Sequence, residues 1–418
     1  MVTVILFIFL ASVKIFALNF DWERNQLSEF ETIDNSVIRF GSSTPSTAPK
    51  NDCKVVPGDL GWPSEEDWAS FNETLGGALL KPKPLGSVCY AGEGYSAAQC
   101  QTLKSNWAGM NLQYVKTIRQ VAMGIRKHLC TYFAAKFDVY TRRLSSLRLN
   151  FARNNNIRLV IKNSGHDFNG KSIGGHSLSV WTHNLKGIAY LANYTSPTGS
   201  YTGQAVAYAA GVQAFEGSLL MRRHNITFIV AGGSTVGIAG GFLQGGGHSV
   251  YTSYYGLAAD QVLAITAVTA DGMVVEAHEG QNADLFWAFR GGGGGITGTY
   301  GIITSVVIKA FPDTPRVSGS IRFSTTPTRG SNASAISVDT FWAGMKAYWE
   351  FGPAICDAGG LGYNYIYPNS TSTGLTFTVS ISLPNRSLEE YRRFIRPLLE
   401  KLNGLGIDIP IPSLKRSL

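Results

Sequence analysis

Short apolar or alternating runs follow one another along most of this chain, and glycine-rich turns separate them. Such runs predict strands at 158–161, 205–212, 227–230, 263–268, 273–276 and 302–308. Apolar positions that recur with a helical period predict helices at 145–155, 215–224 and 284–289. Strands that alternate with short helices in this way indicate an α+β fold.

The pattern changes after Pro312, where the predicted elements become longer. Strands are predicted at 317–323, 362–367 and 375–383, and helices at 341–350 and 387–402. Ser387 and Glu390 form a capping box at the start of the last helix, and Gly404 follows its end. Strands and helices in this order predict a second domain that is built on an antiparallel sheet.

Two segments carry the strongest chemical signal. In 157–175 a short apolar strand runs into a polar turn, Asn163-Ser164-Gly165-His166-Asp167. In 232–249 eight of eighteen residues are glycine. Glycines at this density remove side-chain bulk, so that backbone N–H groups can approach a large ligand with anionic phosphates.

Together and in this order, the two segments resemble the flavin-binding loops of FAD-linked oxidases of the vanillyl-alcohol oxidase and berberine bridge enzyme type. The resemblance continues through 255–262, 268–275, 284–295 and 300–309. It implies a p-cresol methylhydroxylase-type FAD-binding domain of two subdomains and a partial substrate domain with an antiparallel sheet. The expected division is a signal peptide at 1–17, an N-terminal extension at 18–143, the FAD-binding domain at 144–312 and the partial substrate domain at 313–418.

The resemblance also implies a set of cofactor-binding residues. In such oxidases the histidine of the Gly-His-Asp turn is bonded covalently to the flavin, so His166 is expected to carry FAD. Related enzymes with a second flavin bond have a cysteine before Thr-Val-Gly, whereas Ser234 precedes Thr235 here, so a single linkage is expected. The expected FAD contacts are His166, Asn163, Ser164, Gly165, Asp167, Gly233, Ser234, Thr235, Val236, Gly237, Gly240, Gly241, Gly301 and Ile302. No metal site is predicted.

The expected chemistry is that of the cofactor: hydride passes from a C–H bond of a small-molecule substrate to flavin N5. The small side chain of Val236 in the Thr-Val-Gly position favours O2 as the electron acceptor, and a dehydrogenase that does not use O2 is the alternative. Tyr363, Tyr365 and Tyr367 alternate along one strand face, but no catalytic base is assigned. In the resembling family the base comes from a C-terminal part that the chain is expected to lack, which keeps a non-catalytic relative as a further alternative.

The net charge of +8 invites a nucleic-acid interpretation, which the distribution of charge opposes. Between Gln113 and Arg148 eight cationic residues accompany the single acidic residue Asp138, so this segment carries +7. The rest of the chain is close to neutral, and no nucleic-acid partner is expected. The same segment has a helical period where the resembling family has a strand; if that strand is missing, the first FAD subdomain lacks an edge.

The N-terminus predicts secretion. Residues 1–17 are apolar except for Lys14, which favours a signal peptide over a membrane anchor, and no stable membrane insertion is expected. Acceptor sequences for N-glycosylation agree with an extracellular protein; they begin at Asn72, Asn193, Asn225, Asn332, Asn369 and Asn385. Of the five cysteines, Cys89 and Cys100 are the first pair expected to form a disulfide, and Cys130 is expected to be unpaired.

Overall fold

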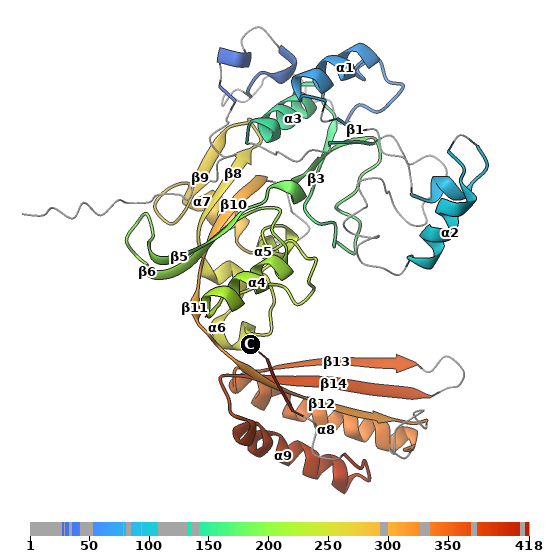
Figure 1. Ribbon diagram of the computed structural model, residues 1–418, viewed down its shortest axis with the longest axis vertical. Coiled ribbons are helices and arrows are strands. Elements are labelled where there is room, and N and C mark those ends of the chain that lie inside the picture. The colour runs from blue at the N-terminus through green and yellow to red at the C-terminus, as the bar shows by residue number, and fades with distance from the viewer. Residues whose placement is uncertain are drawn as a thin grey trace, which may run out of the picture.

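The computed structural model describes residues 27–28, 30–32, 36–41, 53–77, 79–80, 85–92, 94–107, 132–135, 142–292, 300–326, 335–368, 374–409 and 414–417. These residues form three sheets of four or five strands and one two-stranded sheet, with helices packed against them (Figure 1). Two sheets lie together in the upper part of the molecule, and the third lies below them with its own helices (Figure 1). The predicted α+β fold with a separate antiparallel domain is confirmed.

The first sheet has the strand order β1-β2-β4-β3. Its strands are β1 (Leu79–Leu80), β2 (Tyr132–Ala135), β4 (Ser177–Trp181) and β3 (Arg158–Lys162). Strand β4 pairs in parallel with both β2 and β3. Parallel strands need a crossover connection, and the chain segments that join these strands are long enough to make one. The helical period predicted for the basic segment is wrong at 132–135, because β2 lies there and pairs with β4, so the strand is not missing. The other residues of that segment before Arg142 lie outside the described part of the chain.

Helix α3 (Arg142–Asn154) joins this sheet to helix α1 (Glu65–Thr74). Phe151 of α3 is fully buried and stacks on Phe71 of α1, with 3.8 Å between the ring centroids. Elements α1, β1 and β2 all precede residue 144 and pack with or pair in the first subdomain, and the expected division into domains stays a prediction. Residues before 144 complete the first subdomain.

The second sheet is antiparallel throughout, in the order β5-β6-β10-β8-β9. Its strands are β5 (Ile188–Thr195), β6 (Thr202–Ala209), β10 (Gly301–Lys309), β8 (Val262–Thr269) and β9 (Val274–Ala277). Strand β10 lies at the centre, and its first eight residues are buried on both faces. Helices α4 (Ala214–His224), α5 (Gly241–Gln244), α6 (Thr252–Tyr255) and α7 (Ala283–Phe289) belong to this subdomain, as does the short pair β7 (Ile226–Thr227) and β11 (Phe311–Pro312).

The two subdomains share a small apolar contact. Leu149 of α3 and Val180 of β4 come from the first subdomain, and Val268 of β8 and Ile302 of β10 come from the second. All four side chains are at most 6% exposed. Removal of this apolar surface from water holds the subdomains side by side, and the loops of the candidate site extend from both of them.

The third sheet forms the domain predicted after Pro312, in the order β13-β14-β12-β15. Its strands are β13 (Leu361–Pro368), β14 (Leu375–Pro384), β12 (Arg316–Ser324) and β15 (Lys415–Ser417), all antiparallel. Helices α8 (Val338–Asp357) and α9 (Leu388–Gly404) cover one face and share an apolar core with it (Figure 1). The predicted capping box is present, because Ser387 Oγ accepts from Glu390 N and Glu390 Oε2 accepts from Ser387 N.

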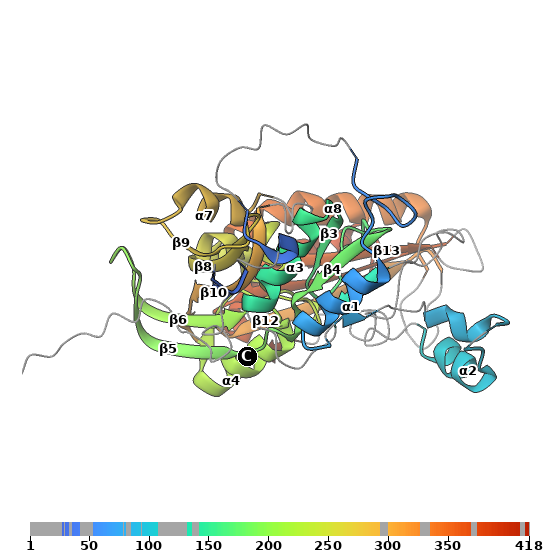
Figure 2. The same cartoon turned by 90° about the horizontal axis from the view of Figure 1, so that it is seen from above.

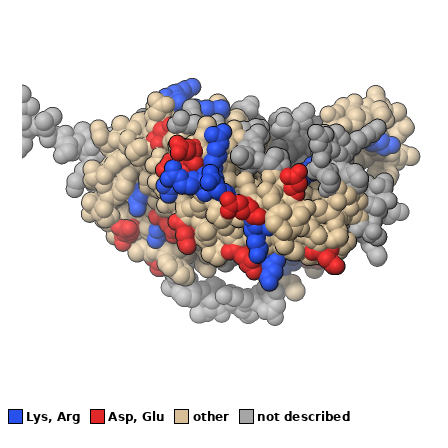
Figure 3. Space-filling model, turned by 90° about the horizontal axis from the view of Figure 1, so that it is seen from below, with Lys and Arg blue, Asp and Glu red and all other residues tan. Residues whose placement is uncertain are grey.

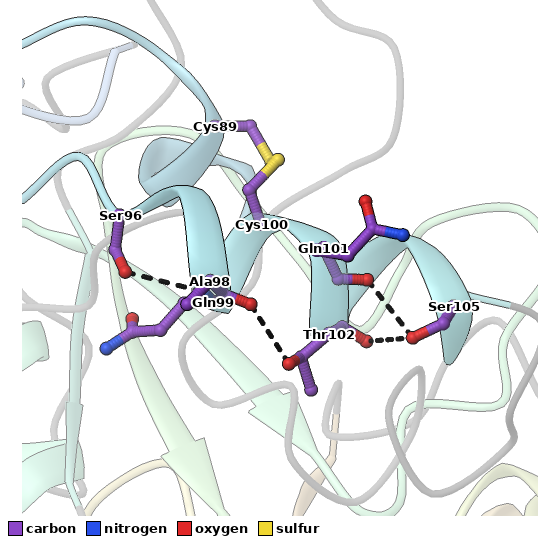
Figure 4. Close-up of a disulfide and its surroundings, with 8 residues drawn as sticks. All are labelled: Cys89, Ser96, Ala98, Gln99, Cys100, Gln101, Thr102 and Ser105. Carbon is purple, nitrogen blue, oxygen red and sulfur yellow. Dashed lines mark hydrogen bonds between the residues drawn. A yellow bond between two sulfur atoms is a disulfide. The ribbon is translucent and has the colours of Figure 1, made fainter.

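The cysteines agree with the first predicted pair. Cys89 and Cys100 form a disulfide with 4.9 Å between their Cα atoms, and it joins α2 (Ala97–Ser105) to the turn before it (Figure 4). Cys53 and Cys356 are free and exposed. Cys130 lies outside the described residues, as does the predicted signal peptide.

Charges on the described surface are mixed. On the face that carries the helices of the third domain, Lys and Arg side chains alternate with Asp and Glu (Figure 3). Pairs such as Arg393–Glu389 and Arg386–Glu390 along α9 contribute to this pattern. This one face therefore carries both signs of charge, and the expectation of no nucleic-acid partner stays a prediction. Among the helices of the described part, none combines the length and apolar character needed to cross a bilayer.

Candidate functional site

The first loop of the site, residues 163–167, begins where β3 ends. Asn163 is buried, and its Nδ2 donates to Ala210 O at 2.6 Å and to Thr182 Oγ1 at 3.2 Å. Gly165 has φ +94°, and a Cβ at this position would lie 2.8 Å from Lys162 Cε. The turn that presents His166 therefore favours glycine for its backbone conformation, and a Cβ there would also require the Lys162 side chain to shift.

The second loop, residues 232–241, lies against the N-terminal end of α4. Ser234 O accepts from Phe215 N, and Val236 O accepts from Ala214 N, each at 2.9 Å. Gln213, the residue before α4, donates from Nε2 to Thr235 O at 2.6 Å. These bonds hold the middle of the loop, while Gly232, Gly233 and Ser234 remain exposed at its tip.

The fold brings the two loops together although about seventy residues separate them in the sequence. His166 Nε2 lies 2.8 Å from Thr235 Oγ1, and Ser164 Oγ accepts from Gly237 N at 3.0 Å. A Cβ at Gly240 would lie 2.6 Å from Asn163 Cβ, so only a residue without a side chain fits there. The loop residues chosen from the sequence are thus one site in space.

The geometry fits an anionic cofactor. The backbone N–H groups of Gly165, Gly233, Ser234 and Thr235 make no hydrogen bond to another described residue. Backbone N–H groups of glycine-rich turns that have no partner within the protein can bind phosphate oxygens. Asn163 Oδ1 is also buried without a hydrogen-bond partner among the described residues. The residues present therefore suit the diphosphate and the polar edge of a dinucleotide such as FAD.

Burial changes the pKa of two basic groups here. It lowers the pKa of His166, and the hydrogen bond with Thr235 opposes this effect in part. It also lowers the pKa of Lys162 to about 8, because that side chain is only 8% exposed. A negative charge beside Lys162 would favour its protonated form. Sequence reasoning missed Lys162 and Gln213; the signal for Lys162 was a cation at the end of an otherwise apolar strand.

His183 lies behind the first loop and was also missed. It is 7% exposed, and its ring stacks on Trp181 at 4.9 Å between centroids. The backbone carbonyl oxygen of His183 lies against Gly211, and a Cβ added at Gly211 would collide with this oxygen. Burial lowers the pKa of His183 to about 4, and the positive charge of Lys186 adds to this effect.

The low pKa of His183 predicts a loss of stability in acid. An unfolded histidine titrates at about 6.5, so the contribution of neutral His183 is complete above that pH and is lost as the pH falls towards 4. The melting temperature, measured across this range, should fall more steeply for the parent chain than for His183→Gln. His248→Gln, at an exposed position, is the control and should keep the parent profile. Equal profiles for all three proteins would contradict the assignment.

The remaining predicted contacts lie apart from the two loops. Gly301 and Ile302 begin β10, and Ile302 is buried in the apolar contact between the subdomains. A Cβ at Gly301 would lie 2.6 Å from Val268 O, so packing against β8 explains the glycine. Their contact with the adenine half of FAD stays a prediction.

Comparison with known proteins agrees with this site. Residues 146–278 match the family described as FAD binding domain. FAD-linked oxidoreductase patO of Aspergillus clavatus is 37% identical over 374 residues, which cover 86% of this chain and 62% of patO. VAO-type flavoprotein oxidase VAO615 of Thermothelomyces thermophilus is 34% identical over 395 residues, which cover 89% of this chain and 66% of that protein.

A solved structure shows the same similarity in three dimensions. The crystal structure of VAO-type flavoprotein MtVAO615 from Myceliophthora thermophila C1 matches 87% of this chain and 66% of its own, with a TM-score of 0.74 and 31% identity. The chain thus spans between 62% and 66% of the length of these relatives. The chain thus contains an FAD binding domain, and in its fold and along most of its length it is similar to vanillyl-alcohol oxidase-type FAD-linked oxidoreductases.

Proposed function

We propose that this chain holds FAD through one covalent bond to His166 and uses it to oxidise a C–H bond of a small molecule, with O2 as the electron acceptor. The observation that carries the proposal is the meeting of the two loops, with His166 against Thr235 and N–H groups beside them. The cofactor supplies the hydride acceptor. The residues of the two loops hold the phosphates of FAD and place the flavin ring beside His166. Asn163 is buried between the loops, away from water.

The environment of His166 supports a covalent bond. A histidine must be neutral to act as a nucleophile, and burial lowers its pKa and so favours the neutral form at neutral pH. The bond to Thr235 Oγ1 fixes the direction of the ring. Ser234 stands at the tip of the second loop, and no cysteine lies in that loop to form a second bond. A single attachment follows.

We place the substrate-binding site of this proposal at the third domain. The sheet face away from its helices carries the exposed tyrosines Tyr363, Tyr365 and Tyr367, and a phenol is one of the groups that can take a proton during oxidation. We assign no base among them. An alcohol, a sugar or a secondary metabolite is the proposed class of substrate.

The purified protein provides the test. A yellow protein whose flavin stays with the chain after acid precipitation supports the covalent FAD enzyme. Flavin that is recovered quantitatively in the supernatant contradicts the covalent bond but keeps FAD binding. A colourless but folded protein supports the alternative of a relative without catalytic activity.

Val236 gives a test of the electron acceptor. It follows Thr235 in the second loop and is partly exposed. If its small side chain leaves the flavin open to O2, Val236→Leu should slow reoxidation of the reduced flavin by about tenfold, the effect of an added barrier near 1.4 kcal/mol. Stopped-flow mixing of the reduced protein with oxygenated buffer measures this rate. Val236→Ala is the control and should reoxidise at least as fast as the parent.

Persistence of the reduced parent protein in air would contradict the oxidase proposal. Rapid reoxidation of that same protein by a quinone or a dye would then support the dehydrogenase alternative.

Secretion is part of the proposal. The Cys89–Cys100 disulfide is typical of oxidising compartments, and the acceptor residues Asn193 and Asn225 are exposed in the folded chain. Protein from the culture medium of a native or fungal host should lose mass on N-glycosidase treatment. Recovery of the full-length chain, unmodified, from the cell interior alone would contradict secretion.

A further inference from the structure

The third sheet presents one face to its helices and the other to the FAD-binding domain (Figure 1). Asn364 of β13 points to the helices, because its Nδ2 donates to Tyr348 OH of α8 at 3.1 Å. Side chains alternate along a strand, so Tyr363, Tyr365 and Tyr367 point to the opposite face. Their exposed fractions are 56%, 44% and 47%.

Strand register extends this face across the sheet. Residues that lie directly opposite one another in paired strands point to the same side. Tyr365 pairs with Thr378, and Thr378 pairs with Arg322. The two neighbouring rows are Tyr363-Ser380-Ser320 and Tyr367-Thr376-Ser324. We call these three rows the polar face.

On the polar face the rings of the three tyrosines contact one another in a row along β13. The Tyr363 and Tyr365 rings are perpendicular with 5.2 Å between centroids, and the Tyr365 and Tyr367 rings are stacked at 5.4 Å. These contacts use part of each ring and leave the rest exposed. Ring faces in this arrangement bind planar, unsaturated groups by stacking.

Arg322 is the charged member of the polar face. The core residues Ile321 and Phe323 on either side of it point to the helices, which confirms that Arg322 points away from them. It is exposed and has no ion pair with another described residue. No acidic residue belongs to the three rows. A guanidinium in such surroundings is suited to a carboxylate, which it binds with two parallel hydrogen bonds.

We infer that the polar face binds a substrate that carries both a planar unsaturated ring and a carboxylate, the ring against Tyr365 and the carboxylate at Arg322. Neighbouring strands lie about 4.8 Å apart, so the Cα atoms of Tyr365 and Arg322 are separated by about 10 Å. Both side chains are long, and a molecule the size of an aromatic acid spans the remaining gap. Thr378, between them, offers a hydroxyl to a polar substituent. The inference rests on the proposed function, of which it names the substrate class.

The experiment compares aromatic acids with their uncharged amides as ligands. Calorimetric titration of the full chain with benzoate, benzamide, cinnamate and cinnamamide measures binding directly and does not depend on flavin. Each acid should bind about tenfold more tightly than its amide, as expected for one charge-assisted pair. Arg322→Gln should abolish this preference, and Arg322→Lys should retain part of it because a point charge remains.

Two controls separate recognition from folding. Arg392→Gln removes the same charge from α9, on the helix side of the same domain, and should keep the full preference for acids. Tyr365→Ala should weaken acid and amide alike, whereas Tyr365→Phe should weaken neither, because the ring face is what stacks.

Two results would overturn the inference: acids that bind no more tightly than amides, or a preference for acids that survives in Arg322→Gln. Flavin content, measured separately on the same samples, reports on the proposed function. A chain without flavin that still binds acids through Arg322 would therefore contradict the function and not the inference.

Discussion

Gly240→Val should abolish flavin binding and lower the melting temperature by several degrees. The added Cβ would lie 2.6 Å from Asn163 Cβ, inside the contact distance of two carbon atoms. Asn163 has little freedom to move, because it is buried and held by Ala210 O and Thr182 Oγ1. The first loop must then separate from the second, at a cost of about 1–3 kcal/mol. Flavin absorbance per chain and thermal melting measure the two effects.

Gly352→Val is the matched control. A Cβ at Gly352, on α8, meets no atom within 4 Å, so this variant tests the same exchange of residues without a collision. It should keep the flavin content and melting temperature of the parent. Unchanged flavin content in Gly240→Val would mean that the two loops do not form the cofactor site. Loss of flavin in both variants would show that the assay reports general damage.

The two loops could be recognised from the sequence because each signal lies within a short segment; the FAD contacts of their residues stay a prediction. The turn Asn163–Asp167 consists of polar residues and a glycine, and the glycine is needed because Gly165 has a positive φ of +94°. The close approach of the second loop to the side chain of Asn163 needs glycine at Gly237 and Gly240. Asp260 is likewise a capping residue that accepts from Leu257 N. Each of these demands acts on a few neighbouring residues, so it leaves a readable pattern.

Elements whose identity depends on distant partners could not be predicted in this way. Strand β2 lies in a stretch with a helical period, and only its parallel pairing with β4 makes it a strand. Strand β4 is buried at all five positions although Ser177 and Ser179 alternate with apolar residues, so its sequence does not show that both of its faces are covered. The helix predicted at 341–350 instead continues to Asp357, with Pro353 inside it. Tertiary packing overrides local preference in all three places.

The polar residues that support the site were also missed, for a related reason. Gln213, just before α4, donates a hydrogen bond to Thr235 O. His183, just after β4, places its carbonyl oxygen against Gly211. Nothing in the sequence near either residue indicates what it will contact. The same holds for the polar face of the third domain, since the alternation of Tyr363, Tyr365 and Tyr367 is visible in the sequence but Arg322 joins them only through strand register.

His166→Ala should convert a covalently held flavin into one that dissociates. The loops and their N–H groups remain, so the variant should still take up FAD, but acid or denaturant should release all of it. In the parent, protease digestion should yield one fluorescent flavin peptide, which contains His166. His248→Ala is the matched control, because His248 is exposed and lies near the second loop. It should keep its flavin in acid.

Thr235→Val refines this prediction, because Thr235 Oγ1 lies 2.8 Å from His166 Nε2 and directs the ring. Valine keeps the shape of threonine and removes the hydroxyl, which should lower the covalent fraction without preventing FAD uptake. Covalent flavin in His166→Ala would place the bond on another residue. A parent chain whose flavin is entirely released by acid would remove the covalent bond from the proposed function. The two loops would then still account for FAD binding, since the backbone N–H groups that suit the diphosphate do not depend on the histidine side chain.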